Sequence, residues 1–311
     1  MIISPGFVGI DISKSTLDIF DAAIGRSERI DNASAPIAAL VERWRTKPVF
    51  VLFEATGRYD RLLQTALHEA GIAFARVNPL RARDFARAAG FLAKTDAVDA
   101  RMLAMMAERL RPKAEAPAQA ERERLRAWHR RRDQLVHMRA QERNRLSEAS
   151  DPEEHEQIER HIAWLSGEIK VIEGRIRTLI ASVPQLAQLC KRLRQAPGIG
   201  QVAASTLLAL MPELGSRSPK AIAALAGLAP LNRDSGKLRG KRTIGGGRKR
   251  VRDALYMAAL AAVRSSQHFA QIYKALVAAG KAKKLALIAV ARKLLVALNA
   301  MIRDNAEFKP A

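Results

Sequence analysis

The 311-residue chain is long enough to bury a sizeable core and to form two or three domains. It carries a net charge of +22, and residues 191–311 hold most of it, with 23 basic residues against 5 acidic ones. This charge favours a polyanionic partner such as a nucleic acid. A single cysteine, the lack of a signal-peptide pattern and the lack of an uninterrupted apolar run of about 18 residues argue against a secreted or membrane protein. We expect a cytoplasmic, nucleoid-associated protein.

The N-terminal part predicts a meander of strands. Residues 7–22 read as two short strands joined by a polar turn, and a third strand is expected near 29–31. Asp11 ends the first, apolar strand. A carboxylate in this place is either a turn cap or a rigidly held functional group, and the pattern leaves both interpretations open.

Two further acidic motifs follow. After a helix around 35–45, an apolar run predicts a central strand that ends at Glu54, where a carboxylate is costly without a partner or a cation. Asp96 and Asp99 begin a long helical pattern, and their spacing places both on one helix face. For either aspartate alone, the preference of acids for a helix N-terminus is the better explanation.

Taken together, the four acids predict a metal site. Alternating strands and helices can bring carboxylates from two strand ends and one helix to a single point, where their repulsion requires divalent cations. Hard oxygen ligands suit Mg²⁺ or Mn²⁺, and two such ions can hold and activate a phosphodiester. We therefore expect Asp11, Glu54, Asp96 and Asp99 to bind Mg²⁺ or Mn²⁺.

The same residues carry a family resemblance. The segments GIDISK, FEATG and KTDAVDAR, in this order, resemble the RuvC-like DEDD domain of the IS110 insertion-sequence transposases and of the related Piv DNA invertases. The resemblance spans most of the chain. With the helical patterns that follow, it implies an α/β plus all-α protein. Its three parts would be an RNase H-like (RuvC-like) mixed-sheet domain over 1–112, a protruding antiparallel coiled-coil hairpin over 113–188, and a basic, mainly helical transposase domain over 189–311.

The expected hairpin contains an apolar seam. Asp151 and Pro152 predict the start of its second helix, as N-cap and first helical residue. From Ile158 to Val183, apolar residues recur at alternating spacings of four and three, which is typical of a coiled coil. The seam predicts either packing of one hairpin arm on the other or association with another copy. The family resemblance favours association, into a dimer or tetramer.

A basic, glycine-rich stretch, Leu231–Asp253, contains nine basic residues, five glycines and one serine, Ser235. So dense a charge is unfavourable without a polyanion, and glycines let the backbone approach one closely. A solvated basic loop beside a helix start is the alternative interpretation. Upstream, a PGIG turn resembles a helix-hairpin-helix motif, whose backbone N–H groups can approach a phosphate.

The resemblance implies that Ser235, in a Ser-Gly step, is the nucleophile. Its attack on DNA would leave a phosphoserine link that allows rejoining without ATP. A serine needs help from a base, a metal or a strong field, and arginines can stabilise the charge on the phosphate. All four acidic positions and the serine motif match the family pattern without departure, so the sequence gives no sign of an inactive enzyme. The resemblance further implies an active site shared within a tetramer and a bridge RNA that selects the DNA target. Contacts to nucleic acid are expected from Lys14, Arg58, Lys94, Gly198, Gly200, Arg233, Lys237, Arg239, Lys241, Arg242, Arg248, Lys249, Arg250 and Arg252.

Three other functions remain open. A metal-dependent nuclease of the junction-resolvase type would use the same acids with water as the nucleophile, and it would tolerate Ser235→Ala. An actin-like or sugar-kinase phosphotransferase would explain the N-terminal hairpin, but we find no second glycine-rich phosphate loop. A non-enzymatic DNA-bridging protein would explain the charge and leave the acids without a role.

Overall fold

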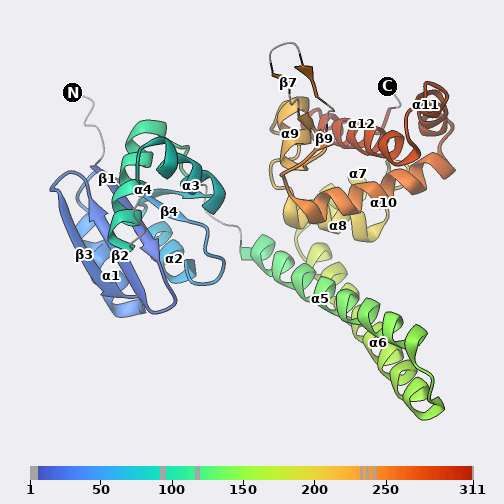
Figure 1. The fold of residues 1–311 in the computed structure, drawn as a ribbon, viewed down its shortest axis with the longest axis horizontal. Helices are drawn as coiled ribbons and strands as arrows, with labels where there is room; N and C mark the ends of the chain where they lie inside the picture. The colour runs from blue at the N-terminus through green and yellow to red at the C-terminus, as the bar shows by residue number, and fades with distance from the viewer. Residues whose placement is uncertain are drawn as a thin grey trace. The chain divides into compact units, whose positions relative to one another are not determined.

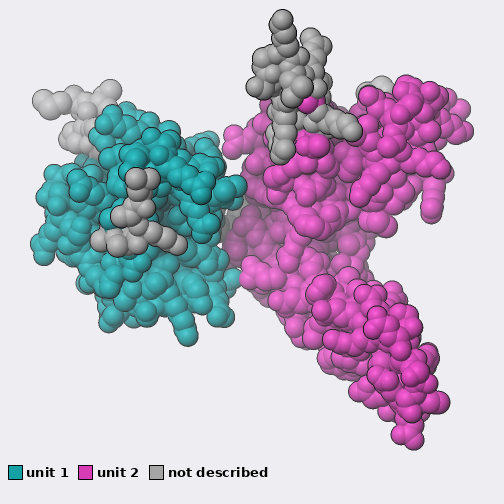
Figure 2. All heavy atoms as spheres, viewed as in Figure 1, with its two compact units in different colours: residues 1–117 teal, residues 118–311 magenta. Residues whose placement is uncertain are grey.

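Figure 1 presents the computed structural model, which describes residues 6–91, 96–115, 120–231, 234–235, 238–240 and 243–309. By packing, the chain divides into two compact units, residues 1–117 and 118–311 (Figure 2). The structure thus groups the expected hairpin with the C-terminal part, whereas the three-domain division given by the sequence stays a prediction.

Unit 1 contains a five-stranded mixed sheet in the order β3-β2-β1-β4-β5. Its first three strands, β1 (Gly6–Ile12), β2 (Thr16–Asp21) and β3 (Arg26–Asp31), form the predicted antiparallel meander. Strands β4 (Val49–Glu54) and β5 (Ala73–Val77) extend the sheet in parallel from β1. The mixed α/β class is confirmed, and the arrangement is consistent with an RNase H-like domain.

Helices cover both faces of this sheet: α1 (Ser34–Trp44), α2 (Arg61–Glu69), α3 (Pro79–Ala88) and α4 (Asp96–Leu110). Side chains alternate along a strand, so Phe53 of β4 is buried in the same core as α1 and α2, while Leu52 is buried in the core with α4. Both faces of the central strands are therefore apolar. This explains why β4 reads as a continuous apolar run up to Glu54.

Unit 2 begins with the helical hairpin α5 (Ala120–Glu148) and α6 (Pro152–Ala181). The Asp151 side chain accepts hydrogen bonds from the N–H groups of Glu153 and Glu154, so the predicted N-cap is confirmed. The seam residues of α6 are buried within the single chain, except for the partly buried Ile162, in a hairpin whose two helices pack along each other. The seam is therefore internal packing, which corrects its interpretation as an association surface. A regular coiled coil stays a prediction.

The rest of unit 2 is a helical bundle with two small strand pairs. Its helices are α7 (Pro184–Leu193), α8 (Gln201–Leu210), α9 (Pro219–Leu225), α10 (Lys249–Ser265), α11 (Gln267–Ala278) and α12 (Lys283–Arg303). Its strands are β6 (Pro230–Leu231), β7 (Asp234–Ser235), β8 (Leu238–Arg239) and β9 (Thr243–Ile244). One apolar core runs from Leu125 in α5 to Met301 in α12, so hairpin and bundle share it.

Helix α12 is long and apolar enough to span a membrane by length and composition alone, but half of its apolar window is buried inside the protein. It packs against α10, α11, α9 and α7, as the core helix of a bundle does. An apolar groove of about 1240 Å³ is lined by residues of α11 and α12, and it reaches from Pro230 and Ile244 at the paired strands to Phe308.

Candidate functional site

A close crossing of helix and sheet places Asp11 beside α4. Gly9, two residues before Asp11, faces the same side of the sheet. A Cβ atom at Gly9 would lie 2.0 Å from the carbonyl oxygen of Ala100 and 2.3 Å from the nitrogen of Ala104, so only glycine allows the helix to approach this closely. The crossing brings the first turn of α4 to the end of β1.

Asp11 and the two aspartates of α4 interact electrostatically. Partial burial, followed by the charges of Asp99 and Asp96, raises the pKa of Asp11 to about 6. A divalent cation relieves repulsion of this kind, and carboxylate oxygens are the ligands that Mg²⁺ and Mn²⁺ prefer. The side chains therefore fit the predicted ion. Among the described residues, however, no three acidic, histidine or cysteine side chains converge as a ready-made metal site.

The sheet register brings Glu54 to the same place. In the parallel pair of β1 and β4, Ile10 lies opposite Phe53, so the next residues, Asp11 and Glu54, occupy corresponding positions on neighbouring strands. Both follow residues of the α1–α2 core, and the alternation of side chains points both toward the α4 side. All four predicted acids thus belong to one side and one end of the sheet.

Asp18 and Arg29 also lie on this face, although the sequence motifs did not indicate them. Asp18 of β2 lies directly opposite Asp11, and Arg29 of β3 lies directly opposite Asp18. The Arg29 Nε donates to Asp18 Oδ1 at 2.9 Å, and its Nη2 donates to Asp96 Oδ2 at 3.1 Å. The signal was present, since alternation along β2 with Leu17 and Ile19 in the core leaves Asp18 on the opposite face.

The loops that follow the first two acids are tied together. The side-chain Nδ2 of Asn32 donates to the carbonyl oxygens of Ser13 and Tyr59, both at 2.9 Å, and so links the turn after Asp11 to the loop after Glu54. Two expected nucleic-acid contacts are exposed on these loops. One is Lys14, and the other is Arg58, whose guanidinium lies 5.3 Å from the centre of the Tyr59 ring.

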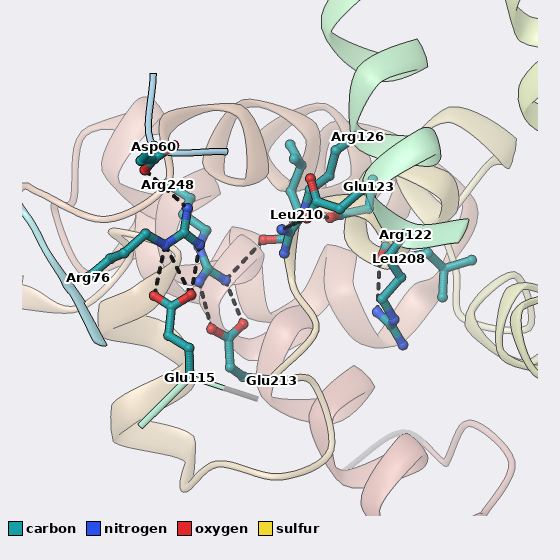
Figure 3. A network of polar contacts seen from close by, with 11 residues as sticks. Asp60, Arg76, Glu115, Arg122, Glu123, Arg126, Leu208, Leu210, Glu213 and Arg248 are labelled. Carbon is teal, nitrogen blue, oxygen red and sulfur yellow. Dashed lines mark hydrogen bonds and ion pairs between the residues drawn. The ribbon is translucent and has the colours of Figure 1, made fainter. Parts of the chain in front are cut away.

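A partly buried cluster of polar side chains lies at the β5 edge of the sheet in unit 1. Arg76 on β5 pairs through two nitrogens with Glu115, at 3.0 and 2.9 Å (Figure 3). Its Nη1 also lies 3.7 Å from Oδ2 of Asp60, a fully buried carboxyl whose pKa is raised chiefly by that burial. Asp60 ends the FEATGRYD segment, so these contacts fix one end of the loop that follows Glu54.

Ser235 lies in a small antiparallel ladder in unit 2. Its strand β7 pairs with β8, with Ser235 opposite Leu238, and β6 pairs with β9. The predicted nucleophile therefore lies on a two-residue strand, and we call the segment from β6 to β9 the serine loop. Only the backbone of Ser235 and Arg239 is described, and the other predicted contacts Lys94, Arg233, Lys237, Lys241 and Arg242 lie outside the described residues.

Two glycine-containing turns lie at the two ends of the serine loop. We call them the neck and define it as Gly227, Gly246 and Gly247. All three have positive φ angles, and a Cβ atom at Gly247 would lie 2.2 Å from the nitrogen of Gly227. Arg252 Nη1 donates hydrogen bonds to two carbonyl oxygens of the neck, that of Gly246 at 2.8 Å and that of Gly227 at 3.5 Å. The neck thus holds the two ends of the serine loop together.

Other expected nucleic-acid contacts have partners inside unit 2. Arg248 forms a bidentate pair with Glu213, with both bonds at 2.6 Å, and donates to the carbonyl of Leu210 at 2.9 Å (Figure 3). Burial acts to raise the pKa of Glu213, but the hydrogen bonds and the charge of Arg248 keep this pKa below its usual value. Arg248 therefore has a structural role that the sequence did not indicate.

The neighbouring cations also have partners. Arg250 of α10 lies 3.1 Å from Asp133 of α5, while Lys249 forms an exposed pair with Asp253 within α10. In the PGIG turn, a Cβ atom at Gly198 would lie 2.1 Å from the Ala258 carbonyl oxygen, so this glycine allows the turn to pack on α10. Gly200 borders open space before the first turn of α8.

Acids at the ends of two neighbouring strands and at the start of a crossing helix are consistent with an RNase H-like DEDD domain. Comparison with known proteins agrees. Residues 8–150 match the DEDD family described as transposase, and residues 190–274 match the IS116/IS110/IS902 transposase family.

The chain is 30% identical to the pilin gene-inverting proteins of Moraxella lacunata and Moraxella bovis, over 98% of this chain and 98% of each relative. It is also 30% identical to an insertion element IS110 protein of Streptomyces coelicolor, over 44% of this chain and 33% of that protein. The chain therefore belongs to the IS110 family of transposases and is a DNA recombinase. Its DEDD domain suggests dependence on a divalent cation.

Proposed function

We propose that this transposase cuts and rejoins DNA in the cytoplasm through a covalent phosphoserine intermediate on Ser235. Asp11, Glu54, Asp96 and Asp99 would hold Mg²⁺ or Mn²⁺ at the scissile phosphate. The observation that carries the proposal is the gathering of these acids on one side of one sheet end, where burial and the α4 aspartates raise the pKa of Asp11 to about 6. A bound divalent cation would neutralise the acids and stabilise the charge that develops on the phosphate.

The serine step balances without a further reactant. The Ser235 Oγ attacks phosphorus, the bond from phosphorus to one deoxyribose oxygen breaks, and the proton of the serine passes to that oxygen, which becomes the hydroxyl of the released strand. A strand hydroxyl can then attack the phosphoserine, which restores the serine and rejoins DNA. One phosphoester replaces another at each step, so no ATP is required.

The acids and the serine belong to different compact units, which supports an active site assembled from parts. We propose, in line with the family resemblance, that copies of the chain share such sites in a dimer or tetramer. The hairpin seam is buried, so association through the hairpin would use the outer face of α6. Trp164 and Val171 are seven residues apart there, and they are 56% and 49% exposed.

DNA is the substrate that the charge of unit 2 favours, and a bridge RNA is the proposed guide. Guided recombination divides the work physically, because a protein can recognise the backbone and shape of a duplex while base pairing reads the sequence. If binding neutralises about 6 to 10 phosphates, a rise in salt from 50 to 200 mM should lower the affinity by roughly 10³ to 10⁵. Lys14, Arg58 and Lys249 are exposed and are proposed contacts.

A denaturing gel tests the proposal. The purified protein is incubated with Mg²⁺, RNA transcribed from the DNA that flanks its gene, and labelled junction DNA. We expect a covalent protein–DNA band with the wild type and with the control Ser265→Ala, and none with Ser235→Ala. Cleavage without a band, unchanged by Ser235→Ala, would instead identify a nuclease of the junction-resolvase type that uses water.

A further inference from the structure

Arg29 bridges the sheet and the start of helix α4 through two carboxylates. Asp11, Asp18 and Arg29 stand side by side on three neighbouring strands, so their side chains share the face that α4 covers. From this row the Arg29 guanidinium reaches Asp18 with Nε and Asp96 with Nη2, at 2.9 and 3.1 Å. One cation thus joins a sheet carboxylate to one of the predicted metal ligands.

We propose that Arg29 is a built-in counterion of the acidic site, which competes with the divalent cation for the Asp96 carboxylate. The inference rests on the proposed function, since it assumes that Asp96 is a metal ligand. It makes Arg29 a positioning residue that sets how tightly the metal binds.

The surrounding charges explain why a counterion is needed. Asp18 is only 8% exposed and lies opposite Asp11, while the first turn of α4 adds Asp96 and Asp99 to the same side. Carboxylates so close together repel one another, and each is stabilised by a nearby positive charge. Arg29 neutralises Asp18 and Asp96 at once, which a single point charge on a lysine does less well.

The geometry also explains how Arg29 can give way. The two hydrogen bonds use different nitrogens, so the bond to Asp96 can break while Nε stays on Asp18. The side chains of Arg29 and Asp96 are 57% and 59% exposed, and water can therefore solvate both after they separate. Only the exposed half of the bridge has to open when Asp96 turns to a metal ion.

The direction of the effect follows from this competition. A metal ion that binds Asp96 must break the ion pair with Arg29 and must tolerate its positive charge nearby. An exposed ion pair changes an affinity by at most roughly fivefold. Removal of the guanidinium should therefore tighten metal binding by about that factor. A supporting residue that oriented Asp96 for the metal would have the opposite effect, since its loss weakens binding.

The test is a calorimetric titration of the full chain with Mn²⁺, without nucleic acid. Arg29→Gln removes the charge and keeps a side chain that can donate a hydrogen bond to Asp18. Arg43→Gln is the matched control, because Arg43 pairs with Glu28 in the same unit and its loss changes the net charge equally. Asp11→Asn tests whether the acids bind the ion at all. Thermal unfolding of each variant verifies that it is folded.

We expect the dissociation constant for Mn²⁺ to fall about fivefold in Arg29→Gln, to be unchanged in Arg43→Gln and to rise strongly in Asp11→Asn. Suppose that the dissociation constant for Mn²⁺ is unchanged or higher in Arg29→Gln, while Asp11→Asn binds Mn²⁺ more weakly than the wild type. This result would overturn the role of Arg29 but leave the metal site in place. Equal binding by Asp11→Asn and the wild type would overturn the metal site itself. If Arg29→Gln is unfolded, the single variant Asp18→Asn is compared with the double variant Asp18→Asn/Arg29→Gln instead. Both variants lack the buried Asp18 carboxylate, so neither leaves it without its charge partner.

Discussion

Gly9→Ala should disable the acidic site although Gly9 itself does no chemistry. Ordinary van der Waals contact begins near 3.4 Å, but the new methyl group would lie 2.0 Å from the oxygen of Ala100 and 2.3 Å from the nitrogen of Ala104. Both are backbone atoms of α4, so the whole helix must move away from β1 by about 1.5 Å. Overpacking of this kind typically costs about 1–3 kcal/mol of stability.

The loss of function should exceed the loss of stability. The displaced helix carries Asp96 and Asp99, and a functional site tolerates errors of only about 0.5 Å. A misplacement of about 1 Å can cost roughly 100-fold in rate. We therefore expect a folded Gly9→Ala variant to form the covalent DNA adduct at an initial rate about 100-fold lower, and to bind Mn²⁺ more weakly.

The assays are Mn²⁺ titration, adduct formation on junction DNA and thermal unfolding. Gly6→Ala is the matched control on the same strand, because its Cβ atom would meet Ala23 Cβ at 3.4 Å and Pro48 O at 3.8 Å, which are near-ordinary contacts. It should stay within about twofold of the wild type, as surface substitutions without a clash generally do. Normal Mn²⁺ binding and a normal initial rate of adduct formation in Gly9→Ala would refute the idea that this crossing positions the acids.

Three further predictions concern stability and pH. The folded pKa of Asp11 is raised to about 6, so its ionisation destabilises the metal-free fold as pH rises through 6, and Mn²⁺ binding should weaken as pH falls through 6. Asp11→Asn should therefore stabilise the chain at pH 7.5 by about 1 kcal/mol after solvent screening, and by little at pH 4; calorimetric unfolding at both values checks this. Ile169→Asn should cost about 2–5 kcal/mol and leave the mass in light scattering unchanged, whereas a changed mass at equal stability would return the seam to an association surface. Glu213→Gln should lower the unfolding temperature, because it removes the charge partner of half-buried Arg248 at a cost of about 1–3 kcal/mol; equal melting would assign Arg248 to solvent or nucleic acid.

Unit 1 was largely predictable because its signals are local. The apolar runs before Asp11 and Glu54 predict two strands, each with an acidic residue at its end. Parallel pairing of these strands then makes Asp11 and Glu54 neighbours. The row from Asp11 through Asp18 to Arg29 was not found, because it depends on the antiparallel register of two further strand pairs. The alternation of side chains along β2 indicates which face of the sheet Asp18 occupies, but it does not indicate that Asp11 and Arg29 lie beside it.

Periodicity alone could not settle the hairpin seam. A spacing of four and three buries Ile169 equally well against α5 or against a second copy, so the same pattern fits both, and the three-dimensional packing decides. In unit 2, composition predicted that Arg248 and Gly198 face a phosphate. Their partners Glu213 and Ala258 are 35 and 60 positions away along the chain, and local sequence carries no trace of such contacts.

The neck fixes the two ends of the serine loop, so the length of the loop has little effect on the stability of the bundle. Gly227, Gly246 and Gly247, with Arg252, close the base of the loop against the bundle. Once the ends of a loop are fixed, even doubling its length costs only about 0.6 kcal/mol. The fold should therefore tolerate insertions beyond the neck at little cost in stability.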